Sequence, residues 1–192
     1  MTKFLEYALQ ENSMIYNIES IFESDYQAVE KFCNECKKYN WVNNQSLDSM
    51  KFYETLNSGG WLGIKNKNDD IISIAGYHHF NQIGDNCYRI FYRTAALPTQ
   101  KSHYGMAHGA GHRGKAYIKK YIDLLPEQRL FITTNHYNSN YPEIKRYHDH
   151  LVKVSKRKNS YIDYVTDMEL FSITQTVWEI DIQEFLSNHG IE

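Results

Sequence analysis

The chain has 192 residues, of which 42% are hydrophobic and 23% charged, values ordinary for a soluble globular protein with a sizeable core. Its net charge of −2 argues against a general basic surface for nucleic acid. The sequence has no apolar run long enough to span a membrane and no signal peptide at its start, so the expected location is the cytosol. Three cysteines, an odd number, argue against a disulfide framework.

The first clear element is a helix over residues 24–39, which a capping box of Ser24 and Gln27 would open. Its apolar residues recur at positions i, i+3, i+4 and i+7, which places them on one stripe. That stripe consists of Val29, Phe32, Cys33 and Cys36. The two cysteines have CxxC spacing, but no second CxxC accompanies them. Packing in the core is therefore preferred to a redox or zinc site.

A change of period marks the middle of the chain. A second, shorter helix is expected over 46–56, and residues 61–65 and 71–80 then form two strand candidates. A polar turn separates these strands, so they are expected to pair as a hairpin. A third strand is expected over 87–97, where Pro98 stops it.

The remaining elements alternate between helices and strands. A helix is expected over 116–125, a strand over 130–136 and a helix over 139–151. Strand-like runs follow at 161–165 and 176–182. This order predicts an α/β (α+β) fold with a mixed sheet.

No repeat, low-complexity segment or Pro/Gly/Ser-rich linker divides the chain, so residues 1–192 are expected to form a single domain. Two interpretations stay open for residues 1–20. They form either an N-terminal extension or a first strand around 14–18.

The stretch from Lys101 to Tyr117 is unusual, because it holds four of the ten glycines and three of the nine histidines. His108 and His112 have the i, i+4 spacing that can bind zinc on a helix. No glutamate occupies the position that a metalloprotease needs, and the glycines weaken a helix. A metal-binding protein using His103, His108 and His112 is therefore kept only as a lesser alternative.

The late helix carries a recognisable pattern. Asn140, Ile144 and Tyr147 stand at relative positions 0, +4 and +7, and Leu151 follows four residues later. Together with the order of elements over 24–182, this pattern resembles the GNAT acyltransferase superfamily, in which Gly-Phe is usual at the places of Leu151 and Val152. The resemblance implies a mixed, mostly antiparallel sheet flanked by helices.

The resemblance also implies acetyl-CoA as co-substrate, with its pyrophosphate held by a loop that opens a helix. Helix N-termini present unsatisfied N–H groups and a partial positive charge, which suits a diphosphate. The family's phosphate-loop pattern can be aligned with this sequence in two ways, which we call frames, and both matches are imperfect. The first frame contains Gly105 and Ala107. The other frame comprises Arg113, Gly114, Lys115 and Ala116.

The resemblance assigns roles in the transfer step as well. Tyr147 would protonate the departing thiolate, and Asn140 belongs to the cofactor-binding set. A backbone N–H near the end of the third strand would polarise the thioester carbonyl, with Ala96 and Leu97 as the candidates. The strand over 87–97 lacks the glutamate that many family members use as a base.

In the absence of that glutamate, His78 or His79 is the candidate base, alongside a water relay or an amine that is already neutral. The predicted function is therefore an acyl-CoA-dependent N-acyltransferase in which an amine attacks the thioester directly. A non-catalytic binding module of the same fold is the main alternative. The acceptor is expected to be a small-molecule or peptide amine, and a homodimer stays open.

Overall fold

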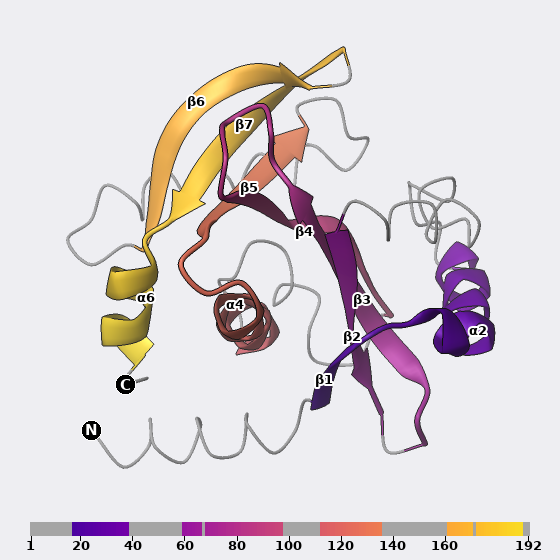
Figure 1. Ribbon diagram of the computed structural model, residues 1–192. Coiled ribbons are helices and arrows are strands. Elements are labelled where there is room, and N and C mark those ends of the chain that lie inside the picture. The colour runs from indigo at the N-terminus through magenta and orange to yellow at the C-terminus, as the bar shows by residue number, and fades with distance from the viewer. Residues whose placement is uncertain are drawn as a thin grey trace. The chain divides into compact units, whose positions relative to one another are not determined.

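The computed structural model describes residues 17–38, 59–66, 68–97, 112–135, 161–170 and 172–189. Figure 1 shows the elements within these ranges. They are β1 (Asn17–Ser20), η1 (Glu23–Asp25), α2 (Tyr26–Lys37), β2 (Gly59–Lys65), β3 (Ile71–His79), β4 (Cys87–Ala96), α4 (His112–Leu124), β5 (Arg129–Asn135), β6 (Ile162–Leu170), β7 (Ile173–Ile180) and α6 (Ile182–His189). The helices expected over 46–56 and 139–151 lie outside the described residues.

The described strands follow the order β1-β2-β3-β4-β5-β7-β6. β4 and β5 are parallel, whereas β1 with β2, β2 with β3, β5 with β7 and β6 with β7 are antiparallel. The expected mixed, mostly antiparallel sheet flanked by helices is confirmed. Within the described ranges, no helix combines the length and apolarity that crossing a bilayer requires.

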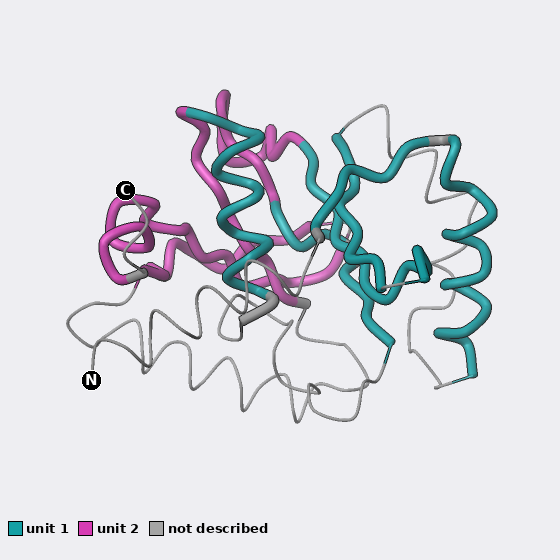
Figure 2. Tube along the Cα trace, turned by 90° about the horizontal axis from the view of Figure 1, so that it is seen from below, with its two compact units in different colours: residues 1–78, 90–126 teal, residues 79–89, 127–192 magenta. Residues whose placement is uncertain are grey.

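The chain divides into two compact units, which Figure 2 shows in different colours. Unit 1 comprises residues 1–78 and 90–126, and unit 2 comprises residues 79–89 and 127–192. The borders fall within β3 and β4, so each of these two strands contributes residues to both units.

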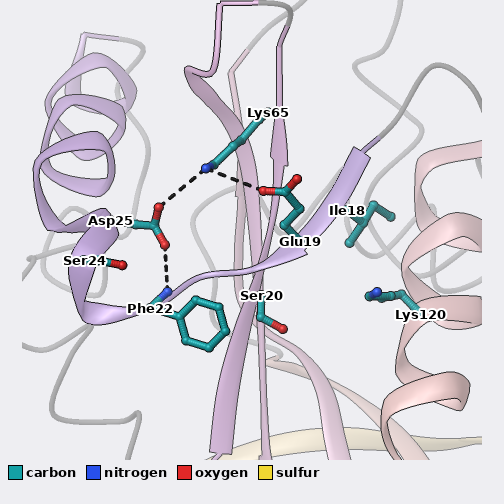
Figure 3. Close-up of a pocket in the computed structure, with 8 residues that line it drawn as sticks. All are labelled: Ile18, Glu19, Ser20, Phe22, Ser24, Asp25, Lys65 and Lys120. Carbon is teal, nitrogen blue, oxygen red and sulfur yellow. Dashed lines mark hydrogen bonds and ion pairs between the residues drawn. The ribbon is translucent and has the colours of Figure 1, made fainter.

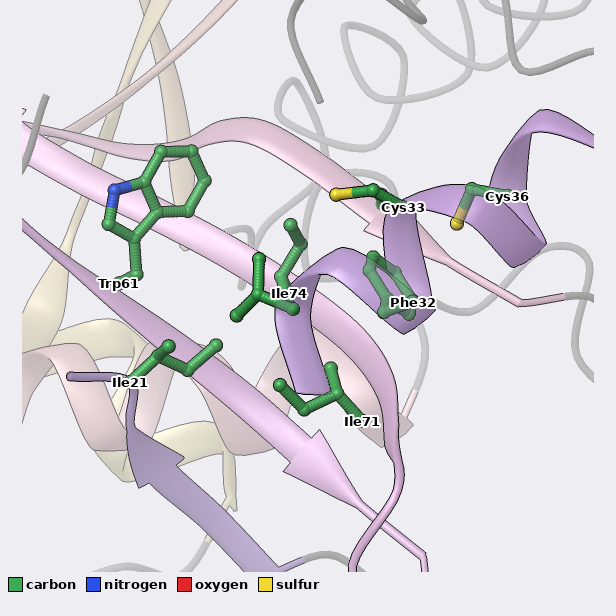
Figure 4. Packing of buried hydrophobic residues seen from close by; sticks show 9 residues of the cluster. Ile21, Phe32, Cys33, Cys36, Trp61, Ile71 and Ile74 are labelled. Atoms are coloured by element: carbon green, nitrogen blue, oxygen red, sulfur yellow. The ribbon is translucent and has the colours of Figure 1, made fainter. Parts of the chain in front are cut away.

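Helix α2 covers one face of the β2–β3 hairpin in unit 1. Its predicted stripe is buried and packs against the hairpin, as Figure 4 shows. Burying each large apolar side chain of this kind contributes about 1.5–3 kcal/mol, so the stripe is what holds the helix to the sheet. The cluster consists of Ile21, Val29, Phe32, Cys33, Cys36, Trp61, Ile71, Ile74 and Ala95.

The predicted capping box is wrong. A 3-10 turn over Glu23–Asp25 takes up Ser24, so α2 begins one residue later than the box requires, at Tyr26. Asp25 precedes the helix but makes no side-chain capping bond to it. Its Oδ2 instead accepts the N–H of Phe22 at 2.9 Å, which closes the turn before the helix.

Helix α4 lies on the opposite face of the β2–β3 hairpin from α2 (Figure 1). Tyr117 and Ser73 share a hydrogen bond between their hydroxyl groups at 3.0 Å. Tyr121 donates to the carbonyl of Gly76 at 3.3 Å, and burial raises the pKa of this phenol well above its usual range. Both rings also contact Phe91, at centroid distances of 6.0 and 5.6 Å. The helix is thus held by hydroxyl groups that find partners inside the core.

Unit 2 has its own apolar cluster, and its C-terminal part differs from the prediction. β6 runs on to Leu170, past a register shift between Tyr164 and Thr166. The expected strand at 176–182 gives way after Ile180 to helix α6. The sequence signal for this helix is Asp181, because aspartate is a preferred N-cap residue. In the structure its carboxylate accepts the N–H of Glu184 at 2.9 Å. The cluster consists of Phe80, Cys87, Phe131, Leu170 and Val177.

The buried cysteines lead to a first prediction, which concerns thiol reactivity. Cys33, Cys36 and Cys87 are buried and form no disulfide, and burial raises the pKa of Cys36 to about 12. Because the thiolate is the reactive form, the native protein is expected to resist iodoacetamide at about pH 8. Mass spectrometry should find three labels only in denaturant. Labelling of native Cys33 or Cys36 at the rate of a free thiol would contradict their core role.

Candidate functional site

The backbone of β4 is irregular at its centre. Phe91 has a φ of 57°, a left-handed conformation that costs a bulky residue about 1–3 kcal/mol. The Thr94 hydroxyl donates to the Phe91 carbonyl at 2.7 Å and so satisfies an acceptor within the irregular stretch. Such local distortions of a strand re-aim the side chains that follow them.

The hydrogen bonds to β3 show the size of the irregularity. The N–H of Phe80 donates to Cys87, and the N–H of Leu97 donates to Ile72. Between these two bonds the chain covers eight residues on the β3 side, from Ile72 to Phe80, and ten on the β4 side, from Cys87 to Leu97. β4 therefore carries two residues more than its partner over this stretch, as a β-bulge does.

The parallel ladder between β4 and β5 is short. It pairs Cys87, Tyr88 and Arg89 with Arg129, Leu130 and Phe131. Both strands continue beyond it, β4 as far as Ala96 and β5 as far as Asn135. The described part of β5 therefore has four further residues for which no partner in β4 is in register.

At the end of β4, the two backbone N–H groups predicted to polarise the thioester carbonyl point to different edges of the strand. The Leu97 N–H is engaged, because it donates to the Ile72 carbonyl at 2.9 Å. Neighbouring residues of a strand direct their N–H groups to opposite edges. The Ala96 N–H therefore lies on the edge of β4 that faces away from β3.

The first turn of α4 contains one of the two predicted phosphate-binding frames. α4 begins at His112, so Arg113 and Gly114 lie in its first turn, where N–H groups have no intrahelical acceptor. Lys115 is half-buried, and desolvation lowers the pKa of its ammonium group. Ala116 is half-buried as well. The arrangement offers an anion backbone donors and one partly desolvated cation.

The two histidines on β3 have different surroundings. His78 is half-buried, and its ring meets the edge of the Tyr92 ring at a centroid distance of 4.7 Å. His79 is exposed, and its Nε2 shares a hydrogen bond of 2.8 Å with the Tyr88 hydroxyl. Adjacent strand residues point to opposite faces, so the two imidazoles cannot serve one site together.

Several predicted site residues fall within unit 1, and others lie outside the described residues. Unit 1 includes His78, Ala96, Leu97 and the frame Arg113–Ala116, whereas His79 belongs to unit 2. The predicted residues outside the described ranges are Gly105, Ala107, Asn140 and Tyr147, together with His103 and His108 of the metal alternative. In the described ranges, no three His, Cys, Asp or Glu side chains are grouped so that they could hold a metal ion.

Two features of this region were not predicted. The positive φ of Phe91 has no sequence signal, because glycine, asparagine and aspartate are the residues expected in that conformation. A polar cluster in unit 2 was also missed. There Gln175 accepts hydrogen bonds from Arg89 and Thr133, each at 2.8 Å. The pairing of β4 with β5 and that of β5 with β7 bring these residues together.

Comparison with known proteins gives a fold but no close relative. The sequence matches no family profile, and it matches no curated protein. It is similar in structure to a GNAT-family acetyltransferase from Staphylococcus aureus Mu50, at 13% identity and a TM-score of 0.54, over 86% of this chain and 98% of the other. It is also similar to spermidine N-acetyltransferase from Vibrio cholerae, solved with CoA and spermine, at 10% identity and a TM-score of 0.54, over 90% and 99%.

Proposed function

Because the chain has the fold of the GNAT acyltransferase superfamily, we propose that it transfers an acyl group from acyl-CoA to the amine of a small molecule. This proposal rests on one observation: unit 1 contains both the strand β4, whose backbone is irregular at Phe91, and the helix α4, whose first turn contains Gly114 and Lys115. The strand supplies a backbone donor for a carbonyl, and the helix supplies donors for a diphosphate.

The proposed site holds the donor through its phosphates. The first-turn N–H groups of α4 donate hydrogen bonds to the pyrophosphate oxygens. The half-buried Lys115 adds a positive charge, whose attraction for a phosphate is screened less than at the surface. The Ala96 N–H, on the edge of β4 that faces away from β3, polarises the thioester carbonyl. Polarisation makes the carbonyl carbon more electrophilic and stabilises the charge that develops on its oxygen.

The transfer itself exchanges one bond for another. The neutral amine attacks the carbonyl carbon, a C–N bond forms and the C–S bond breaks. The amine loses one proton to a base, for which His78 is the proposed group, and the thiolate gains one proton from the Tyr147 hydroxyl. The V. cholerae neighbour was solved with spermine, which supports a small amine as the acceptor class.

A non-catalytic binding module is the second candidate, and one observation favours it. β4 contains no aspartate or glutamate, so it lacks a carboxylate base on the strand nearest the proposed carbonyl. Such a module would bind CoA but would not release free thiol from acetyl-CoA in the presence of amines.

The second prediction tests the proposed function by binding and then by turnover. Coenzyme A at about 1 mM is expected to raise the melting temperature, because a ligand that binds only the folded state stabilises it. Lys115→Met should weaken binding about tenfold, as expected for a lost hydrogen bond between charged groups. Tyr147→Phe should leave CoA affinity unchanged and slow thiol release from acetyl-CoA.

The matched control is Lys119→Met on the same helix, whose ammonium group pairs with Asp123 and not with the proposed phosphate site. It should retain CoA affinity. No thermal shift with coenzyme A would reject the proposed function. CoA binding without thiol release, across a panel of small amines, would instead support the binding module.

A further inference from the structure

A cavity of about 510 Å³ opens on unit 1 between β1, the η1 turn, the end of β2 and the side of α4. Its size is in the usual range for small-molecule sites. Figure 3 shows that Ile18 and Ser20 of β1 face the side on which Lys120 projects from α4. Glu19 lies between them in the sequence and points the other way, toward Lys65. The cavity therefore has two differently charged sides.

The side toward β2 has an excess of negative charge. The Lys65 ammonium group lies 3.6 Å from the carboxylate of Glu19, 3.5 Å from that of Asp25 and 3.3 Å from that of Asp69. Three carboxylates surround one half-buried ammonium group, and they raise its pKa despite the opposing effect of desolvation. Lys65 thus has no charge to offer a further anion.

The side toward α4 is cationic. Lys120 makes no ion pair with any carboxylate in the part of the chain that the structure describes. Among the described residues that line the cavity, Lys120 is the one that α4 contributes, and it supplies the positive charge of this wall. Ser20 places a hydroxyl on the opposite wall. A carboxylate between these walls could accept hydrogen bonds from both groups.

The same side also has apolar surface. The Phe22 side chain is 64% exposed, the largest value among the large hydrophobic residues that the structure describes. Ile18 is half-buried on the same wall. An exposed aromatic ring beside a cavity offers a large apolar area that a ligand could cover. The wall therefore suits the apolar body of a ligand whose charged end reaches Lys120.

We propose that this cavity binds a small carboxylic acid with an apolar body. The carboxylate contacts the Lys120 ammonium group and the Ser20 hydroxyl, and the apolar body covers Ile18 and Phe22. The site goes beyond the proposed acyl transfer, and it is separate from the first turn of α4. Lys120 stands eight residues after His112, which corresponds to about 12 Å along the helix.

Titrations followed by NMR test this proposal with four probes. 3-Phenylpropionate combines the charge with the apolar body, 3-phenylpropanol lacks the charge, 3-phenylpropylamine reverses it, and acetate lacks the body. 3-Phenylpropionate is expected to shift the amide resonances of Ile18 to Phe22 and to bind about tenfold more tightly than the alcohol. The amine and acetate should bind more weakly still.

Variants assign the effect to the cavity. Lys120→Gln should remove the preference for 3-phenylpropionate over the alcohol, and Phe22→Ser should weaken both. Lys37→Met, an exposed lysine at the end of α2, should change neither. Saturating coenzyme A should leave the affinity unchanged, which separates this cavity from the proposed transfer site. Equal affinity for acid and alcohol, an unchanged preference in Lys120→Gln, or no binding of any probe would overturn the proposal.

Discussion

Replacing Gly59 with alanine is expected to lower the free energy of unfolding by about 3 kcal/mol or more, at the upper end of what overpacking costs. A Cβ atom at this position would lie 1.8 Å from the Tyr77 carbonyl oxygen and 2.6 Å from the His78 Cα. These are backbone atoms, and the β2–β3 ladder pairs Gly59 directly with His78. Relief would require the hairpin to open at this end.

Gly60→Ala is the matched control, since it adds the same methyl group one residue further along β2. Its Cβ would meet only the far end of the Tyr77 side chain, at 2.3 to 2.7 Å. The ring can move at a cost of about 1 kcal/mol, although it would disturb its edge contact with Tyr121. Urea unfolding of both variants measures the difference. Equal losses, or a larger loss for Gly60→Ala, would show that the backbone approach at Gly59 is not what limits the hairpin.

The second large effect concerns the base of the proposed reaction. His78→Gln is expected to lower kcat by about 10²- to 10⁴-fold, the range that a general base contributes. His78 is favoured because it belongs to unit 1 with Ala96 and the first turn of α4. Tyr92 follows the irregular residue Phe91 on β4, and its ring makes an edge contact with the His78 ring.

His79→Gln serves as the control for that experiment, because it removes an imidazole from the neighbouring position on β3. His79 bonds to the Tyr88 hydroxyl and belongs to unit 2, so kcat should stay within about twofold. A base must be neutral to accept a proton. The fall in activity toward acidic pH in the parent protein should therefore be reduced in His78→Gln and kept in His79→Gln. Similar activities of the two variants would remove His78 from the mechanism.

The elements that periodicity predicts well are those with one strongly apolar face. Helix α2, the β2–β3 hairpin and β5 were all expected, because burial of one face determines both their period and their pairing. Helix α4 starts four residues before the expected position. The propensity penalty of Gly114 argued against helix there, but the glycine is buried, so packing within unit 1 outweighs propensity.

The sequence predicts the surroundings of a candidate site residue well where they depend only on its position along one strand or helix. Alternation along β3 separates His78 from His79, and the structure agrees. It fails where backbone conformation matters, because nothing in the sequence distinguishes Phe91 from its neighbours on β4. The cavity beside β1 was missed for another reason. Its residues come from separate elements, and only tertiary packing brings Phe22 and Lys120 to one site.

The contacts of Phe91 have a consequence for the order in which the protein assembles. The ring of this residue touches Tyr117 and Tyr121, and these contacts help to offset the strain of its left-handed backbone. During synthesis β4 leaves the ribosome before α4 does, so the strained conformation has no such support at first. We therefore expect the distortion of β4 to be fully stabilised when α4 docks. The hairpin of β3 and β4 is then expected to reach its final form only after α4 has been synthesised.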